Sequence, residues 1–220
     1  MILTLREHPK SRAGMSFDPI VQSFERTLRR DPLAPLVVSA ERRSTVEEVD
    51  ALARAALRTL SGMPGTAVGL IAANGPGFLA SLLALRRAGL AAVLFDGQTP
   101  AAEALRILRA LGAAALLRCR SAWPQAPDDW QMTRLEPEDG ARPESFSNWA
   151  VIKLTSGSTG LPRGIATPAE ALIADDANLT ATMGIRPDDR LLTTIPLSQS
   201  YGLSSLAMPA LLRGTPLVLP

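Results

Sequence analysis

Apolar side chains recur with two different periods between residues 44 and 120. In residues 44–61 they return every three or four positions, which predicts a helix with one buried face. Thr45 followed by Glu48 has the spacing of a capping box at the start of that helix. Short apolar runs then predict strands at 67–73, 90–96 and 113–119, with helices between them at 77–89 and 100–112. Apolar strands joined by helices predict an α/β fold, with a mainly parallel sheet flanked by helices.

The pattern is interrupted at residues 121–148, which contain four prolines and many polar side chains. We expect this segment to be a connector on the surface. Regular structure resumes after it: strands are expected at 149–155, 190–196 and 215–220, and helices at 168–183 and 202–214. Pro209 is expected to kink or break the last helix. The chain is therefore divided into a βαβαβ half at 44–120, the connector, and a second half at 149–220.

Composition narrows the classes of protein to which the chain can belong. The 220 residues are 46% hydrophobic and suffice for one large domain or two small ones. The formal net charge is only +2, and basic residues are spread along the chain, which does not favour a nucleic-acid binder. Short arginine pairs are interpreted as solvated surface, namely Arg29-Arg30, Arg42-Arg43 and Arg86-Arg87. One cysteine, Cys119, and one histidine exclude an internal disulfide and a zinc site built from these residue types. Cys119 is expected to be a buried or edge thiol and not a nucleophile.

Neither terminus suggests a targeting or membrane segment. Residues 1–15 are polar and are expected to be flexible, and both Met1 and Met15 remain possible starts. The two most apolar windows, 78–95 and 203–219, are interrupted by arginine or proline and are too short to span a membrane. The sequence therefore predicts a cytoplasmic protein.

Residues 155–164 read TSGSTGLPRG and follow an apolar strand. Glycines allow backbone amides to point into one concavity, and serine and threonine add hydroxyl donors, an arrangement that suits phosphate. Arg163 adds a permanent charge that can bind phosphate oxygens. The spacing fits neither the Walker loop nor the dinucleotide fingerprint. By composition alone, a mobile Gly/Ser linker is the alternative.

TSGSTGLPRG resembles the phosphate-loop signature of the adenylate-forming (AMP-binding) superfamily, which includes acyl-CoA synthetases, fatty acyl-AMP ligases, peptide-synthetase adenylation domains and luciferases. Residues 44–57, 68–100 and 184–203 are similar to further segments of this family, in the family's order. The resemblance runs from about residue 17 to the last residue. It implies that ATP and a carboxylate give an acyl-adenylate and pyrophosphate. A thiol of CoA or of a phosphopantetheine carrier protein then takes the acyl group.

The resemblance also implies which residues form the site. The ATP phosphates would be surrounded by Thr155, Ser156, Gly157, Ser158, Thr159, Gly160 and Gly164, with Arg163 where the family usually has lysine. Gln199 stands where the family often has histidine, and cannot titrate. Gln199, Tyr201 and Gly202 would line the acyl-adenylate pocket. Mg²⁺ would accompany ATP, but no metal ligand is assigned in this chain. Lys153 is expected to be an outward-facing strand residue and not the adenylation lysine.

Family members are much longer than this chain. The resemblance therefore implies that residues 16–220 are an incomplete N-terminal part of the large adenylating domain, without the C-terminal domain that carries the catalytic lysine. We expect the 220 residues alone to be inactive, and a second polypeptide could complete the domain. The absence of basic residues between Gln199 and Leu212 favours a fatty or other apolar acid. The alternative is a non-catalytic remnant or nucleotide-binding module. A dinucleotide-dependent oxidoreductase lacks its fingerprint here.

Overall fold

The larger sheet has six strands in the order β6-β5-β3-β4-β7-β8. The computed structural model covers the whole chain and describes residues 18–62, 66–136, 146, 148–155 and 163–220. The strands are β3 (Ala67–Ile71), β4 (Ala91–Phe95), β5 (Ala115–Cys119), β6 (Trp130–Arg134), β7 (Val151–Thr155) and β8 (Arg163–Thr167). The four inner strands run parallel, and β6 and β8 pair antiparallel at the two edges. This confirms the α/β fold with a mostly parallel sheet.

A smaller sheet has the order β2-β1-β10-β9. Its strands are β1 (Pro35–Val38), β2 (Arg43–Thr45), β9 (Leu191–Leu192) and β10 (Leu217–Val218). Because β1 pairs in parallel with β10, the early part of the chain is hydrogen-bonded to its last residues. Sequence patterning missed β1 and β2, since strands of three or four residues carry too few positions for a period.

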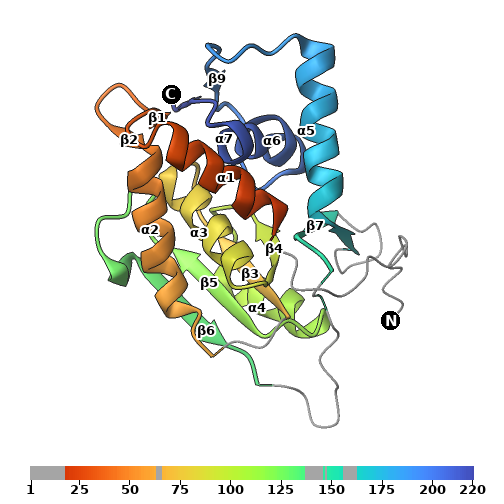
Figure 1. The fold of residues 1–220 in the computed structure, drawn as a ribbon. Helices are drawn as coiled ribbons and strands as arrows, with labels where there is room; N and C mark the ends of the chain where they lie inside the picture. The colour runs from red at the N-terminus through yellow and green to blue at the C-terminus, as the bar shows by residue number, and fades with distance from the viewer. Residues whose placement is uncertain (1–17, 63–65, 137–145, 147, 156–162) are drawn as a thin grey trace.

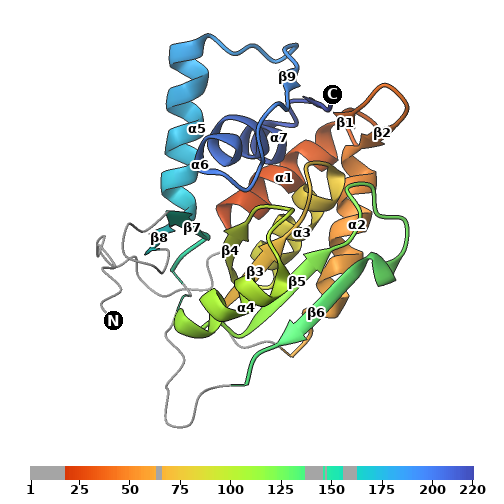
Figure 2. The same cartoon turned by 180° about the vertical axis from the view of Figure 1, so that it is seen from behind.

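Helices cover both faces of the six-stranded sheet (Figures 1 and 2). They are α1 (Pro19–Arg30), α2 (Val46–Thr59), α3 (Pro76–Arg87), α4 (Ala101–Ala110) and α5 (Ala169–Met183). A C-terminal helical run is made of α6 (Ser200–Gly202), the π-helical turn η2 (Leu203–Ala207) and α7 (Met208–Arg213). The helices α2 and α3 lie on one face of the sheet, and α4 lies on the other. The predicted capping box is confirmed, because the Thr45 hydroxyl accepts from Glu48 N and the Glu48 carboxylate accepts from Thr45 N.

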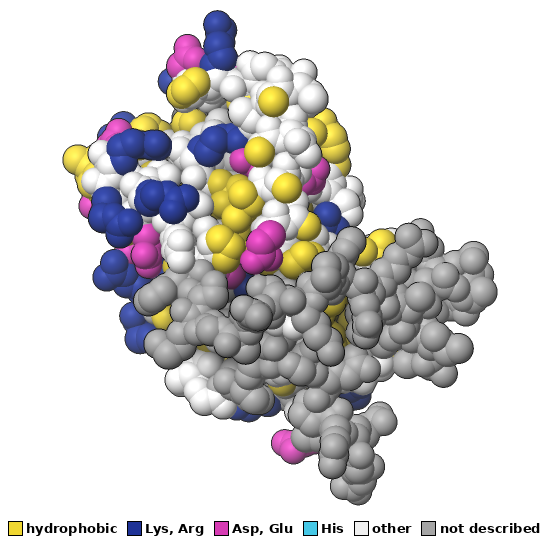
Figure 3. All heavy atoms as spheres, turned by 45° about the vertical axis from the view of Figure 1, so that its right-hand side comes forward, with side chains coloured by type: hydrophobic (Ala, Val, Ile, Leu, Met, Phe, Trp, Pro, Cys, Tyr) yellow, Lys and Arg dark blue, Asp and Glu magenta, His cyan; other side chains and the backbone are white. Residues whose placement is uncertain are grey.

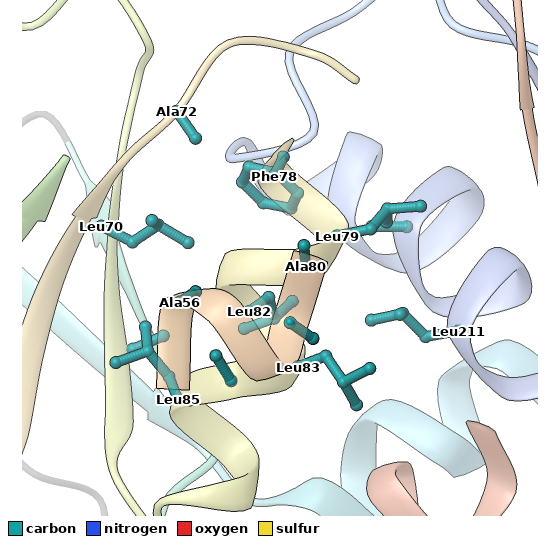
Figure 4. Close-up of a cluster of buried hydrophobic side chains, with 14 of the residues drawn as sticks. Ala56, Leu70, Ala72, Phe78, Leu79, Ala80, Leu82, Leu83, Leu85 and Leu211 are labelled. Atoms are coloured by element: carbon teal, nitrogen blue, oxygen red, sulfur yellow. The ribbon is translucent and has the colours of Figure 1, made fainter. Parts of the chain in front are cut away.

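Side chains of the four inner strands are divided between two hydrophobic clusters, one on each face of the sheet. Val68 and Leu70 of β3 belong to the larger cluster, with α1, α2, α3 and α7. Ala67 and Ile71 of the same strand belong to the smaller one, with α4. Figure 4 shows the centre of the larger cluster, where leucines of α3 lie between β3 and the C-terminal helices. The core is thus mainly aliphatic, and its free cysteine, Cys119, is a buried thiol as expected.

Part of the connector at 121–148 belongs to the sheet, contrary to the prediction of a surface segment. It supplies the 3-10 helix η1 (Pro127–Asp129) and the edge strand β6, which pairs with β5 from Trp130 to Arg134. The side chain of Trp130 is buried, and its indole Nε1–H donates to Ser81 Oγ of α3 at 2.8 Å. Prolines and acidic residues correctly indicate the turn before this strand. They also led to the prediction of a connector where the strand lies.

The prediction that Arg86-Arg87 lies on a solvated face is wrong. Arg86 is buried, donates from Nε and Nη2 to Asp18 Oδ2 at 2.9 and 2.5 Å, and from Nη1 to Leu90 O at 2.6 Å. Arg87 pairs with the buried carboxylate of Asp50 at 2.5 Å. A guanidinium can be buried only when such partners satisfy it, and the two aspartates lie 68 and 37 positions away in the sequence.

The last helical segment is not broken at Pro209. The chain stays helical from Ser200 to Arg213, with five residues in a π-helical turn directly before α7. Pro209 occupies the first turn of α7, where the missing amide N–H costs least. The strand expected at 190–196 is only two residues long, Leu191–Leu192.

Large hydrophobic side chains remain on the surface. Ile165, Met183, Leu192 and Tyr201 are between 53% and 61% exposed. Figure 3 shows hydrophobic side chains near the middle of one face, with lysine and arginine mostly to one side. Throughout the described ranges, no helix combines the length and the apolar character that crossing a membrane requires.

Candidate functional site

The glycine- and hydroxyl-rich segment lies between two paired strands. The strand β7 ends at Thr155, β8 begins at Arg163, and these two residues face each other across the antiparallel pair. The two ends of the segment are therefore fixed next to each other. Ser156, Gly157, Ser158, Thr159 and Gly160 lie outside the described residues, and so does the side chain of Arg163. Their assignment to ATP phosphates stays a prediction.

Gly164 has a packing role in β8. It pairs with Leu154 of β7, and a Cβ at this position would come within 2.9 Å of Ile152 Cγ2. A side chain here would collide with the side chain of Ile152 in β7. This close contact explains the glycine without any ligand, and a phosphate contact by Gly164 stays a prediction.

A polar cavity of about 330 Å³ opens where β4 and β7 end. Leu94 of β4 is paired with Lys153 of β7, and both residues line the cavity together with Asp96, Thr99, Ser198 and Gln199. Parallel α/β sheets bind ligands at the carboxyl ends of their strands, because loops and backbone amides converge there. We define this cavity as the candidate site.

Lys153 faces this candidate site and is not the outward-facing strand residue that was expected. Its side chain is partly buried and lines the cavity. Burial lowers the pKa of the Lys153 ammonium below its ordinary value of 10.5, and the negative charge of Asp175 on α5 partly opposes this. Within the described part of the chain, Lys153 takes part in no ion pair. The cavity therefore has a cation that an anionic ligand could pair with.

Asn74 fixes the other wall of the cavity. Its side-chain nitrogen donates to Ile195 O at 2.9 Å, and its side-chain oxygen accepts from Leu197 N at 2.8 Å. These bonds connect the turn after β3 to the segment just before Ser198 and Gln199. The sequence marked Asn74 only as part of a turn, and no local signal indicates so distant a partner.

The three predicted pocket residues lie in different environments. Gln199 is exposed, lines the cavity and begins the C-terminal helical run as its N-cap. Tyr201 is 61% exposed and is not among the cavity-lining residues. Gly202 is buried, and a Cβ there would lie 2.0 Å from Pro196 O, so the backbone approach requires glycine. The structure thus brings Gln199 to Lys153 but gives Gly202 a packing role.

The described residues contain no group of three or more His, Cys, Asp or Glu side chains that could hold a metal ion. The Asp96 carboxylate accepts a hydrogen bond from its own loop, since its Oδ1 accepts from Gln98 N at 2.9 Å.

The free cysteine is not a candidate nucleophile. Burial raises the pKa of the Cys119 thiol to about 11, so this thiol is protonated near neutral pH and is a poor nucleophile.

A cavity at the carboxyl edge of a mostly parallel sheet lies where α/β domains usually bind their ligands. A family model described as AMP-binding enzyme matches residues 24–220. The chain therefore belongs to the AMP-binding enzyme family. Members of this family activate acids as acyl-adenylates and pass them to CoA or a carrier.

Two similar proteins match most of the chain. The chain is 28% identical to novobiocin biosynthesis protein H from Streptomyces niveus over 91% of its own length and 37% of that protein. It is 27% identical to a feruloyl-CoA synthase from an Amycolatopsis species, over 87% and 42% of the two lengths. The chain thus spans about two fifths of these curated relatives.

Solved structures show the same fold. The N-terminal domain of FACL13 from Mycobacterium tuberculosis, solved with an inhibitor, matches with a TM-score of 0.71 and 21% identity, covering 91% of this chain and 56% of that one. The o-succinylbenzoate CoA synthetase of Bacillus subtilis, solved with its acyl-adenylate intermediate, gives 0.70 and 21%, covering 93% and 56%.

Proposed function

We propose that this chain is the N-terminal portion of an ATP-dependent ligase that activates a carboxylic acid as an acyl-adenylate and transfers it to a thiol. One observation carries the proposal: the TSGSTGLPRG segment of an AMP-binding family member leaves β7 directly beside a polar cavity at the carboxyl edge of the sheet. Residues 16–220 would form part of the large nucleotide-binding domain. The adenylation lysine and the C-terminal domain would belong to a further part of the enzyme.

Binding of the ATP tail is the first task of the site. Thr155 and the amides and hydroxyls of residues 156–160 would surround the β- and γ-phosphates, with the Arg163 guanidinium beside them. Pyrophosphate leaves with several negative charges, and donors held in place before the reaction would stabilise that charge without reorganising. Lys153 would add a second cation at the cavity wall.

The acid would bind next to this phosphate site. Gln199 would hydrogen-bond near the acyl-adenylate, and Leu94, Phe95 and Ile107 give the cavity an apolar side. This lining, with no basic residue between Gln199 and Leu212, supports a fatty or other apolar acid. The thiol acceptor would be CoA or a phosphopantetheine carrier protein, in the cytoplasm. Mg²⁺ would arrive with ATP, and we assign it no ligand in this chain.

Binding of ATP and of inorganic pyrophosphate to the 220-residue chain tests the phosphate site. Arg163→Ala should weaken binding of both about tenfold or more, because a charge-assisted pair is lost. The matched control is Arg109→Ala, which removes an exposed arginine of α4 outside the cavity lining. Equal affinities of the wild-type and Arg163→Ala chains would rule out the proposed phosphate contact.

ATP–pyrophosphate exchange with a panel of carboxylic acids separates the ligase from the alternative of a nucleotide-binding remnant. We expect no exchange by the 220 residues alone. We expect acid-dependent exchange when they are combined with any coding sequence that follows Pro220. ATP binding without exchange in both forms would favour the remnant.

A further inference from the structure

A second cavity lies away from the candidate site. It is a groove of about 790 Å³ between α2 and the loop at 122–127, and it shares no lining residue with the first cavity. Figures 1 and 2 both show this loop beside α2, at the edge of the molecule formed by β6. We call it the α2 groove.

The loop that forms one wall is held in place by several bonds. Gly77 N donates to Ala122 O at 3.0 Å, and Asp129 Oδ2 accepts from Gln125 N and Ala126 N at 2.7 and 3.1 Å. A Cβ on Gly75 would lie 2.6 Å from Ala122 O, so the loop packs directly against the start of α3. The groove is thus preformed, and a ligand would not have to order this wall.

The floor of the groove is apolar. Leu52 and Ala55 of α2 lie on one side, and Trp123 and Pro124 lie on the other. Trp123 is partly exposed, whereas Trp130, which also lines the groove, is buried and bonded to Ser81. A partly exposed indole in a groove is a typical anchor for an apolar side chain of a partner.

Three arginines surround this floor. Arg42, Arg43 and Arg58 are exposed and line the groove, and no ion pair joins any of them to another described residue. The only acidic residue in the lining is Glu48, whose carboxylate already accepts from Thr45 N at 2.9 Å. By contrast, Arg86 and Arg87 are each paired with an aspartate at 2.5 Å. The charge in the α2 groove therefore lacks a counterpart within the described chain.

We propose that the α2 groove binds an acidic peptide segment of a partner protein. Carboxylates of the segment would pair with the guanidiniums of Arg43 and Arg58, and an apolar side chain would lie against Trp123. Guanidinium forks match carboxylates with two parallel hydrogen bonds, and an apolar floor adds burial that a bare polyanion cannot use. The groove combines these charges with apolar side chains, so it differs from the basic stripe along which nucleic acid binds.

A displayed library of random peptides, selected on the 220-residue chain, tests this proposal. We expect enrichment of sequences that combine glutamate or aspartate with an aliphatic or aromatic residue. A fluorescent peptide made from an enriched sequence should bind the chain, and its affinity should fall as salt screens the exposed charges.

The double variant Arg43→Glu with Arg58→Glu should weaken binding of that peptide about tenfold or more. The control, Arg29→Glu with Arg109→Glu, changes the net charge equally at exposed positions on α1 and α4. Trp123→Ala should also weaken binding of the peptide, and circular dichroism checks that each variant is folded.

Three outcomes would overturn the proposal. The first two are enrichment of peptides without acidic residues and an equal loss of peptide affinity in both double variants. The third is displacement of the peptide by inorganic phosphate or duplex DNA at low concentration, because that would indicate a general phosphate site.

Discussion

At the scale of single residues, Lys153 is a partly buried lysine that lines the candidate site. Its neighbours in β7 are aliphatic, and the charge of Asp175 partly offsets the loss of hydration of its ammonium. The sequence places a lysine on a strand but gives no sign of which way it points, because the strand is buried on both faces. Only the pairing of β7 with β4 brings Lys153 to the cavity beside Gln199.

The lowered pKa of Lys153 can be measured by amine labelling, since the chain has only one other lysine, Lys10. We expect Lys153 to become reactive at a lower pH in the folded chain than in the unfolded chain. Asp175→Asn should lower that pH further, because it removes the anion that favours the charged form. Mass spectrometry of each lysine-containing peptide across pH gives both curves. Identical curves in folded and unfolded protein would contradict the burial argument.

The same shift has a consequence for stability. Between the lowered pKa and 10.5, the unfolded chain binds more protons at Lys153 than the folded chain does. The free energy of unfolding should therefore gain a contribution from this group as pH rises through that window. Lys153→Met should remove this gain, which urea unfolding at several alkaline pH values would detect.

Gly202 is a second residue whose role depends on close contact. Its backbone packs against Pro196 O, where a Cβ would be only 2.0 Å away. We expect Gly202→Ala to lower the free energy of unfolding by about 1–3 kcal/mol, since the backbone must shift to make room. Ser200→Ala, at an exposed position in the same helical run, is the control and should be nearly neutral. Equal stability of both variants in urea would contradict the tight approach.

At the scale of elements, patterning succeeded where an element is long and has one clear period. The helices α2, α3 and α4 and the strands β3, β4 and β5 all lie within a few residues of their predicted ranges. It failed for β6, where prolines precede a strand whose pairing with β5 is settled by tertiary contacts. It also missed α1, although Asp18 caps its first turn and Pro19 begins it.

The capping box of α2 offers a test at this scale. Thr45→Ala removes the hydroxyl that accepts from Glu48 N, and it should destabilise the chain by about 1 kcal/mol. Thr45→Ser keeps an acceptor and should retain most of that stability. Urea unfolding of the three proteins measures the difference. A cost for Thr45→Ser as large as that for Thr45→Ala would show that packing, and not the cap, matters here.

At the scale of the whole molecule, the two halves of the chain meet at the candidate site. The sequence indicates the TSGSTGLPRG segment because ten consecutive residues carry its pattern, and its role in binding phosphate stays a prediction. The sequence could not locate the cavity, because the walls come from β4, β7 and residues 198–200, which only the sheet order brings together. Arg86 illustrates the same limit, since Asp18 lies 68 residues away in the sequence.

A substitution of Asn74 tests the contact between the two halves of the chain directly. The Asn74 side chain satisfies Ile195 O and Leu197 N, more than 120 residues along the chain. Asn74→Ala leaves both groups without that partner and should lower the free energy of unfolding by about 1–3 kcal/mol. The more specific result is local: the Leu197 amide should exchange its hydrogen faster in this variant, while amides of β3 keep their protection.

Hydrogen exchange resolved by residue distinguishes this bridge from a general loss of stability. Asn178→Ala, at an exposed position on α5, should leave the Leu197 amide unchanged. Because Leu197 precedes Ser198 and Gln199 directly, a loosened bridge should also weaken any ligand that contacts Gln199, without altering the β7–β8 pair at Thr155 and Arg163. If Leu197 exchanged equally in wild type and Asn74→Ala, Asn74 would not hold this wall, and the position of Gln199 would depend on other contacts, such as the bond from Gln199 N to Pro196 O at 3.1 Å.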